Sequence, residues 1–294
     1  MMGTIPRSLG THDGTFHADE VTACALLLLH DFIDRDKIFR TREQSVLSKC
    51  EIVCDVGGIY DPPKKLFDHH QVDYQGELSS AGMVLQYLRD EKIIEDREYD
   101  FFNHSLILGV DAHDNGRVTP VKGFCVFSNV ISNFTPIEND ADDEELDKAF
   151  LDAVDFVHSH LERLRLRYQY HQKCRQTVAQ CMEKFRDEDC LIFEKNIAWL
   201  ESFFDLGGEK HKAYFVIMPC GKHWKLRGIP PSHEDRMNVR LALPKEWGGL
   251  LDADLKNVSG IEGAVFCHKG RFISVWETLE DALKALEYTL KSSI

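Results

Sequence analysis

The chain has 294 residues, of which 43% are hydrophobic and 29% charged, as in ordinary globular proteins long enough for two domains. Its formal net charge of −14 disfavours a protein that coats duplex DNA, because such a protein must neutralise many phosphates. The longest unbroken apolar run, residues 23–29, is too short to span a bilayer, and the scattered cysteines form no CxxC pair, which favours reduced thiols in a cytoplasmic protein.

Apolar and amphipathic segments alternate along the first half of the chain. Two acidic residues precede residues 21–32, which is typical of a helix amino terminus. The pattern predicts, in chain order, a loop at residues 11–18, a buried helix at 21–32, strands at 37–42 and 51–55, an amphipathic helix at 79–89 and a buried helix or strand at 101–110. This alternation favours an α/β fold with a mostly parallel sheet flanked by helices.

An acidic run at residues 138–147 is typical either of a domain boundary or of a solvated helix start. The polar, helix-like residues after it predict a long connector, and strand-like segments then return before a final amphipathic helix. We therefore predict three parts of the chain. They are an α/β domain at residues 1–140, a helical connector at 141–187 and a smaller α/β domain at 188–294.

Four segments of the first domain carry carboxylates and imidazoles, and each follows an apolar run. They are residues 12–20, 55–58, 68–70 and 111–116. Residues 66–67 predict the end of a buried strand, which places residues 68–70 in the loop where open parallel sheets bind ligands. Crowded carboxylates raise one another's pKa, and a divalent metal relieves that repulsion. Mixed histidine and aspartate ligands suit Mn, Fe, Co or Zn better than Ca.

Each of these segments also has a structural explanation of its own. Asp19 could cap a helix, and Asp55 could belong to a turn before two glycines. His12 and His17 could be solvent-facing loop residues, and residues 69–70 could be surface histidines that flank a loop. The occurrence of all four segments in one chain favours a shared metal site over four separate explanations.

The four segments, in this order, resemble the motifs of the DHH phosphoesterase superfamily and, within it, those of the Myg family. The similar stretches are HDGTFHADE at 12–20, DVGGIYDP at 55–62, FDHHQ at 67–71 and GVDAHDNG at 109–116. The resemblance continues through RLALP at 240–244, Trp247 and VSGI at 258–261, so that it covers nearly the whole chain. That family is described as metal-dependent exonucleases acting on RNA.

The resemblance implies a ligand set for two metal ions. The first ion would be held by His12, His17 and Asp55, and the second by Asp19, Asp55, His69 and Asp111, with Asp55 bridging. Many relatives carry an aspartate at the position of His17, so the preferred metal can differ here. Manganese is the expected metal, with Mg, Co and Zn as alternatives. His70 would face the scissile phosphate as a proton donor or charge stabiliser, and Asp68 would orient an imidazole.

The second half is expected to bind the rest of the substrate. Its most basic stretch contains Lys222, Arg227 and Arg240, and arginine is a bidentate partner of phosphate. Lysines on a strand edge can instead protect that edge from pairing. The expected substrate contacts are Lys222, Arg227, Arg240, Ser259 and Gly260, with Trp224 as a stacking surface for a base. Residues 273–276 read ISVW where relatives tend to carry a glycine-rich segment, which would favour a smaller or different phosphoester.

The sequence therefore predicts a DHH-like, metal-dependent phosphodiester hydrolase, an exonuclease that acts on RNA or short oligonucleotides. Two alternatives stay open. One is a pyrophosphatase or small phosphoester hydrolase that uses the same centre. The other is a non-catalytic nucleotide-binding protein that keeps the metal without turnover. No membrane partner is expected, and a homodimer is left open.

Overall fold

The computed structural model describes residues 3–138 and 141–292, which divide into two compact units between Tyr168 and Gln169. The boundary falls inside the longest helix, α7 (Asp143–Lys184). Its first half contributes Phe150 and Leu161 to the core of the first unit, and its second half contributes Val178 to the second unit. One continuous helix therefore occupies the region of the expected connector.

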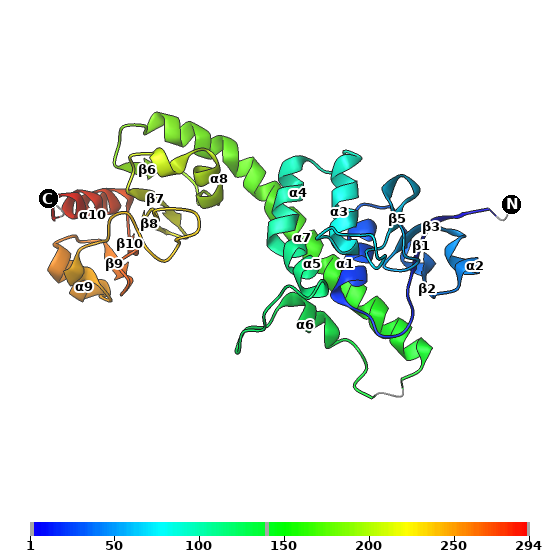
Figure 1. Ribbon diagram of the computed structural model, residues 1–294. Coiled ribbons are helices and arrows are strands. Elements are labelled where there is room, and N and C mark those ends of the chain that lie inside the picture. The colour runs from blue at the N-terminus through cyan, green and yellow to red at the C-terminus, as the bar shows by residue number, and fades with distance from the viewer. Residues whose placement is uncertain (1–2, 139–140, 293–294) are drawn as a thin grey trace. The chain divides into compact units, whose positions relative to one another are not determined.

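The first unit contains a mostly parallel sheet, which confirms the predicted fold class (Figure 1). In spatial order its strands are β2 (Ile38–Arg40), β1 (Ile5–Thr11), β3 (Cys50–Cys54), β5 (Leu66–Phe67) and β4 (Tyr60–Asp61). All neighbours are parallel except β4 and β5. The interior strand β1 was not predicted, because polar Arg7 and Ser8 interrupt its apolar pattern. The register shifts between Ile5 and Leu9, and Arg7 has a positive φ of 58°, so the strand is bulged at this point.

Helices cover the two faces of this sheet unequally. The helices of the first unit, apart from α7, are α1 (Ala18–Leu29), α2 (Gln44–Leu47), α3 (Ser80–Asp90), α4 (Asp96–Phe102), α5 (Leu108–Asp114) and α6 (Phe127–Ser132). Ile52 and Cys54 point into the main core with α1 and α3, whereas Val53 points to a small cluster beneath α2. Helix α1 is buried on nearly all sides because it is apolar all round. A π-helical turn (Asn103–Ile107) joins α4 to α5, so the region expected as helix or strand is helical.

The second unit contains a second five-stranded sheet, with mainly antiparallel neighbours. Its spatial order is β6 (Cys190–Ile192), β7 (Phe215–Cys220), β8 (His223–Gly228), β10 (Ile273–Trp276) and β9 (Ala264–Cys267), and only β6 and β7 are parallel. Its helices are α8 (Leu200–Asp205), α9 (Asp252–Ser259) and α10 (Leu279–Ser292). Short 3-10 turns occur in both units, at Arg35–Lys37 and Pro62–Lys64 in the first and at Gly208–Lys210 and Lys245–Trp247 in the second. Within residues 3–138 and 141–292, no helix combines the length and apolarity needed to cross a bilayer.

The segment that departs from the glycine-rich pattern forms strand β10. Ser274 and Trp276 are fully buried, and the Trp276 indole donates to Ser274 Oγ at 2.9 Å. Trp276 also packs edge-on against Trp247 in the core. This segment is therefore a strand of the second sheet, and its buried side chains pack in the core of the second unit.

His30, at the carboxyl end of α1, is expected to make stability depend on pH. Burial and the charge of Arg165 lower its pKa from 6.5 to about 4, against a smaller opposing effect of Asp31. The unfolded chain then binds more protons than the folded chain between these values. The free energy of unfolding should fall by about 2–3 kcal/mol as the pH drops from 6.5 to 4.

Urea titrations at several pH values would measure this loss. The comparison is between wild type and His30→Leu, because only the variant should lose this part of the pH slope. Exposed His104→Leu is the matched control and should keep the wild-type slope. A His30→Leu profile parallel to wild type would contradict the assignment.

Candidate metal centre

The polar segments of the first unit converge where three strands end. Strand β1 leads into His12, β3 into Asp55 and β5 into residues 68–70. Because these strands are parallel, their carboxyl ends lie at the same edge of the sheet. A cleft of about 990 Å³ opens there, and residues of all four predicted segments line it.

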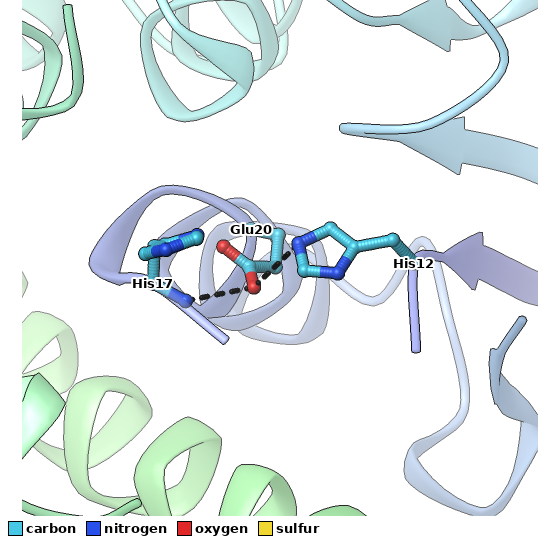
Figure 2. A group of neighbouring side chains, drawn as sticks. All are labelled: His12, His17 and Glu20. Carbon is cyan, nitrogen blue, oxygen red and sulfur yellow. Dashed lines mark hydrogen bonds and ion pairs between the residues drawn. The ribbon is translucent and has the colours of Figure 1, made fainter. Parts of the chain in front are cut away.

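His12, His17 and Glu20 form the first group of candidate ligands (Figure 2). His12 Nε2 lies 3.1 Å from Glu20 Oε1, and the His17 backbone N–H donates to the same oxygen at 2.8 Å. Glu20 is fully buried, and its second oxygen, Oε2, makes no hydrogen bond. Each of the three residues offers a ligand atom within 4.8 Å of the others. Glu20 was absent from the predicted ligand set, because an acidic residue at a helix start is usually explained by the helix dipole.

Asp55 lies between three imidazoles. Its Oδ2 is 3.4 Å from His12 Nε2, and its Oδ1 is 3.5 Å from His69 Nε2 and 3.3 Å from His70 Nδ1. Asp55 has a positive φ of 56°, which turns the chain sharply at the end of β3. The two oxygens of this carboxylate thus face different histidines, which is the arrangement that a bridging ligand requires.

His69 connects Asp55 to a second pair of carboxylates. Its Nε2 is 3.1 Å from Asp114 Oδ2 and 3.9 Å from Asp19 Oδ2. His69, Asp19 and Asp114 form one candidate group, and Asp55, His69 and His70 form another. Asp114 was missed, although it belongs to the predicted segment 111–116. It lies three residues after Asp111 on α5, so the helical spacing could have identified it.

Asp19 and Asp111 are held by the amino terminus of α3. Asp19 accepts hydrogen bonds from the backbone of Ser80 at 3.0 Å and of Ala81 at 2.6 Å. Asp111 Oδ1 accepts from the backbone of Ser79 at 3.1 Å and of Gly82 at 3.0 Å. The Ser79 hydroxyl contacts both carboxylates. Among the described residues, Asp111 lies outside the three candidate ligand groups, but its Oδ2 is buried and makes no hydrogen bond.

The pKa shifts in the centre indicate an excess of negative charge, which a bound cation would neutralise. Burial alone would lower the pKa of His12, but Asp55 and Glu20 outweigh it and raise the pKa to about 10. Burial likewise opposes Asp114 and Asp55 at His69, whose pKa is raised to about 11. Burial, together with the charges of Asp55 and Asp114, raises the pKa of Asp19. Burial would also raise the pKa of Asp55, but His12 and His69 lower it to about 2. Protons on the histidines thus supply positive charge that a metal ion would also supply.

Two buried carboxylate oxygens of the centre, Glu20 Oε2 and Asp111 Oδ2, make no hydrogen bond. Asp55 Oδ1 and His69 Nε2 are also buried without a hydrogen bond, and they have only the ion-pair contacts described above. Buried polar atoms are normally satisfied, and imidazole and carboxylate are ligands of Mn²⁺ and Zn²⁺. The residues present therefore fit a divalent metal.

Asp68 and His70 form a separate contact at the edge of the centre. Asp68 Oδ1 lies 2.8 Å from His70 Nδ1 and accepts from the His70 backbone N–H at 3.0 Å. Its other oxygen accepts from the Gly58 N–H at 2.6 Å. Asp68 is buried, whereas 62% of the His70 side chain is exposed. A fixed carboxylate thus holds an accessible imidazole beside Asp55.

The residues of the second unit that were expected to contact substrate make different kinds of contacts in the structure. The Arg240 guanidinium donates to four backbone carbonyls, those of Gly208, His211, Ala213 and Pro230, and lies over the Phe203 ring. These hydrogen bonds hold the guanidinium within the unit and give Arg240 a structural role. Trp224, expected as a stacking surface, is partly buried and packs against the core of the second unit.

Ser259 and Gly260 end helix α9. Ser259 is buried and its Oγ accepts from the Ile261 N–H at 3.2 Å, and Gly260 has a positive φ of 71°. This is a helix cap, so the motif has a local structural explanation. Lys222 is exposed in the turn between β7 and β8, and Arg227 lies on β8 with a pKa lowered by burial and by the charge of Arg236.

Comparisons with known proteins identify similar chains over the whole length. The model of the MYG1 exonuclease family, described as an uncharacterised protein family (UPF0160), matches residues 8–290. A MYG1 protein of Chlamydia pneumoniae is 52% identical over 287 residues, which cover 98% of each chain. The MYG1 exonuclease of Homo sapiens is 31% identical over 326 aligned positions, which cover 97% of this chain and 86% of the human one. A crystal structure of RecJ with Mn²⁺ from Thermus thermophilus is 12% identical, with a TM-score of 0.27, over 97% of this chain and 52% of RecJ.

Proposed function

Because this chain belongs to the MYG1 exonuclease family, we propose that it is a metal-dependent exonuclease that removes nucleotides from the ends of RNA or short oligonucleotides. Relatives named exonucleases, such as the human protein at 31% identity, support the reaction class. The observation that carries the proposal is the set of ligand groups that meet around Asp55 in a cleft of about 990 Å³.

The proposed centre would hold two divalent ions, with Asp55 as a ligand of both. The first set would be His12, His17, Glu20 and Asp55, and the second would be Asp19, Asp55, His69 and Asp114. Asp111 stays a proposed ligand of the second ion, with a buried Oδ2 that makes no hydrogen bond. Manganese is the proposed ion because imidazoles and carboxylates are mixed in both sets. Two bound cations would neutralise phosphate charge and acidify an attacking water.

The chain's own side chains position and protonate the substrate. His70 is accessible and its Nδ1 is oriented by Asp68, so its imidazole can donate a proton to the leaving oxygen. The orientation of the Asp68 carboxylate is fixed, because its other oxygen accepts a hydrogen bond from the Gly58 backbone N–H. In the second unit, Lys222 and Arg227 are the proposed contacts for further phosphates of the strand.

The decisive experiment removes metal from the protein and then adds it back. Protein dialysed against EDTA should lose hydrolysis of an end-labelled oligoribonucleotide, and added Mn²⁺ should restore it. The product ladder should shorten by single nucleotides from one end. The same preparation should release little phosphate from pyrophosphate, which separates an exonuclease from the pyrophosphatase alternative.

The control is an Asp55→Asn protein purified in the same way, which excludes a contaminating nuclease. Internal cleavage products would contradict exonuclease action. Tight nucleotide binding by the Mn²⁺-loaded protein without any turnover would favour the binding protein instead.

A further inference from the structure

A second, smaller pocket lies beside the metal centre, on the face of the first sheet that α2 covers. Its volume is about 290 Å³. It is lined by Gln44, Leu47, Ser48, Cys50, Val53, Val56, Gly57, Ile59, Lys64 and Leu66. Most of these side chains are apolar, and the polar ones, Gln44, Ser48 and Lys64, are exposed. The pocket thus combines apolar walls with a polar rim, as small-molecule sites do.

This pocket adjoins the metal cleft. Gln44, Leu47, Val56 and Gly57 line both of them. Gly57 follows directly after Val56 in the loop that begins at Asp55, and it has a positive φ of 100°. A Cβ atom on Gly57 would meet nothing within 4 Å, so the side of Gly57 that a side chain would occupy is open space. A ligand bound at the metal centre can therefore extend over this loop into the apolar pocket.

The size and chemistry of the pocket fit one nucleobase. At about 290 Å³ it is at the lower end for ligand sites, which suits a single ring system and excludes several bases. Ile59, 51% exposed, offers apolar surface that a flat ring would cover. The amide of Gln44 and the hydroxyl of Ser48 can each both donate and accept hydrogen bonds at the edge of a base.

We propose that this pocket binds the base of the terminal nucleotide while the adjoining phosphate lies at the metal centre. The assignment rests on the proposed exonuclease function for its substrate class, and it adds a base-binding subsite to it. A base seated here would fix the terminal nucleotide relative to Asp55 and His70. Recognition would depend on the presence of a base more than on its identity, because apolar walls accept any ring face.

A substrate without a terminal base tests the proposal directly. For wild type with Mn²⁺, KM for an oligoribonucleotide should be about tenfold lower than KM for the same strand with an abasic terminal unit. Ser48→Trp places a large ring at the rim of the pocket and should raise KM for the natural strand by about tenfold. It should leave KM for the abasic strand unchanged. Ser45→Trp is the matched control, because Ser45 is exposed on α2, the helix that Ser48 caps, and does not line the pocket.

Equal KM values for natural and abasic strands in wild type would overturn the base subsite. So would a Ser48→Trp effect of the same size on both strands, because the change would then act through the metal centre. Calorimetric binding of a nucleoside 5′-monophosphate and of ribose 5-phosphate, both with Mn²⁺, separates this proposal from the proposed function. Base-dependent binding that Ser48→Trp weakens, in a protein that hydrolyses no phosphodiester, would support the subsite and refute the exonuclease.

Discussion

Replacement of Asp55 by asparagine is expected to remove tight metal binding and to lower kcat/KM by at least about a thousandfold. Asp55 is the carboxylate that His12, His69 and His70 all approach, at 3.3–3.5 Å. Asparagine has the same shape and tolerates the left-handed backbone at this position, so the fold should survive. What is lost is the negative charge shared by the two proposed ligand sets.

Metal content of the purified variant, and Mn²⁺ binding by calorimetry, measure this effect separately from activity. Asp61→Asn is the matched control, because Asp61 pairs with Lys64 and does not line the metal cleft. It should keep both metal and activity. An Asp55→Asn protein that binds Mn²⁺ as tightly as wild type would remove Asp55 from the proposed centre.

Gly82→Ala is expected to destabilise the first unit by about 2–4 kcal/mol, although alanine is the better helix former. A Cβ atom at Gly82 would lie 2.2 Å from Asp111 Oδ2 and 2.8 Å from its carboxyl carbon. The carboxylate would have to move, which would break its bonds to the Ser79 and Gly82 backbone inside the protein. Because Asp19 is held by the same turn of α3, activity should fall as well.

Gly109→Ala provides the contrast, because a Cβ atom at Gly109 in α5 would meet nothing within 4 Å. It should be neutral or stabilising by about 0.5–1 kcal/mol. Urea unfolding curves of both variants, compared at equal m-values, give the two free energies. Similar stability changes in the two variants would show that the Asp111 contact is not what makes Gly82 necessary.

Local patterns predicted much of the fold, because burial imposes periodicity on the sequence. The apolar segment at 21–32 predicts α1, and the run before Asp55 predicts β3 within a residue or two. The strand end at Phe67 and the loop that follows it were also predicted. Strand β1 was missed because a bulge at Arg7 and a buried Ser8 conceal its periodicity.

Some candidate ligands were predicted from the sequence, and others were identified only in the structure. His12, Asp19, Asp55 and His69 were predicted from the motifs, and the structure brings these residues together at one edge of the sheet. Glu20 and Asp114 were missed, since a carboxylate on a helix becomes a ligand only if that side of the helix faces the site. The structural contacts of Arg240 were not predicted, because only the fold brings the four carbonyls to its guanidinium.

The sequence by itself determined the family, the α/β class and the segments that carry the chemistry, because motif order and hydrophobic period are properties of neighbouring residues. The tertiary structure alone decided which oxygen faces which imidazole, which carboxylates the α3 amino terminus holds, and where the apolar pocket meets the cleft. Those relations join residues that are tens of positions apart, and they depend on how strands and helices pack. No local pattern carries that information.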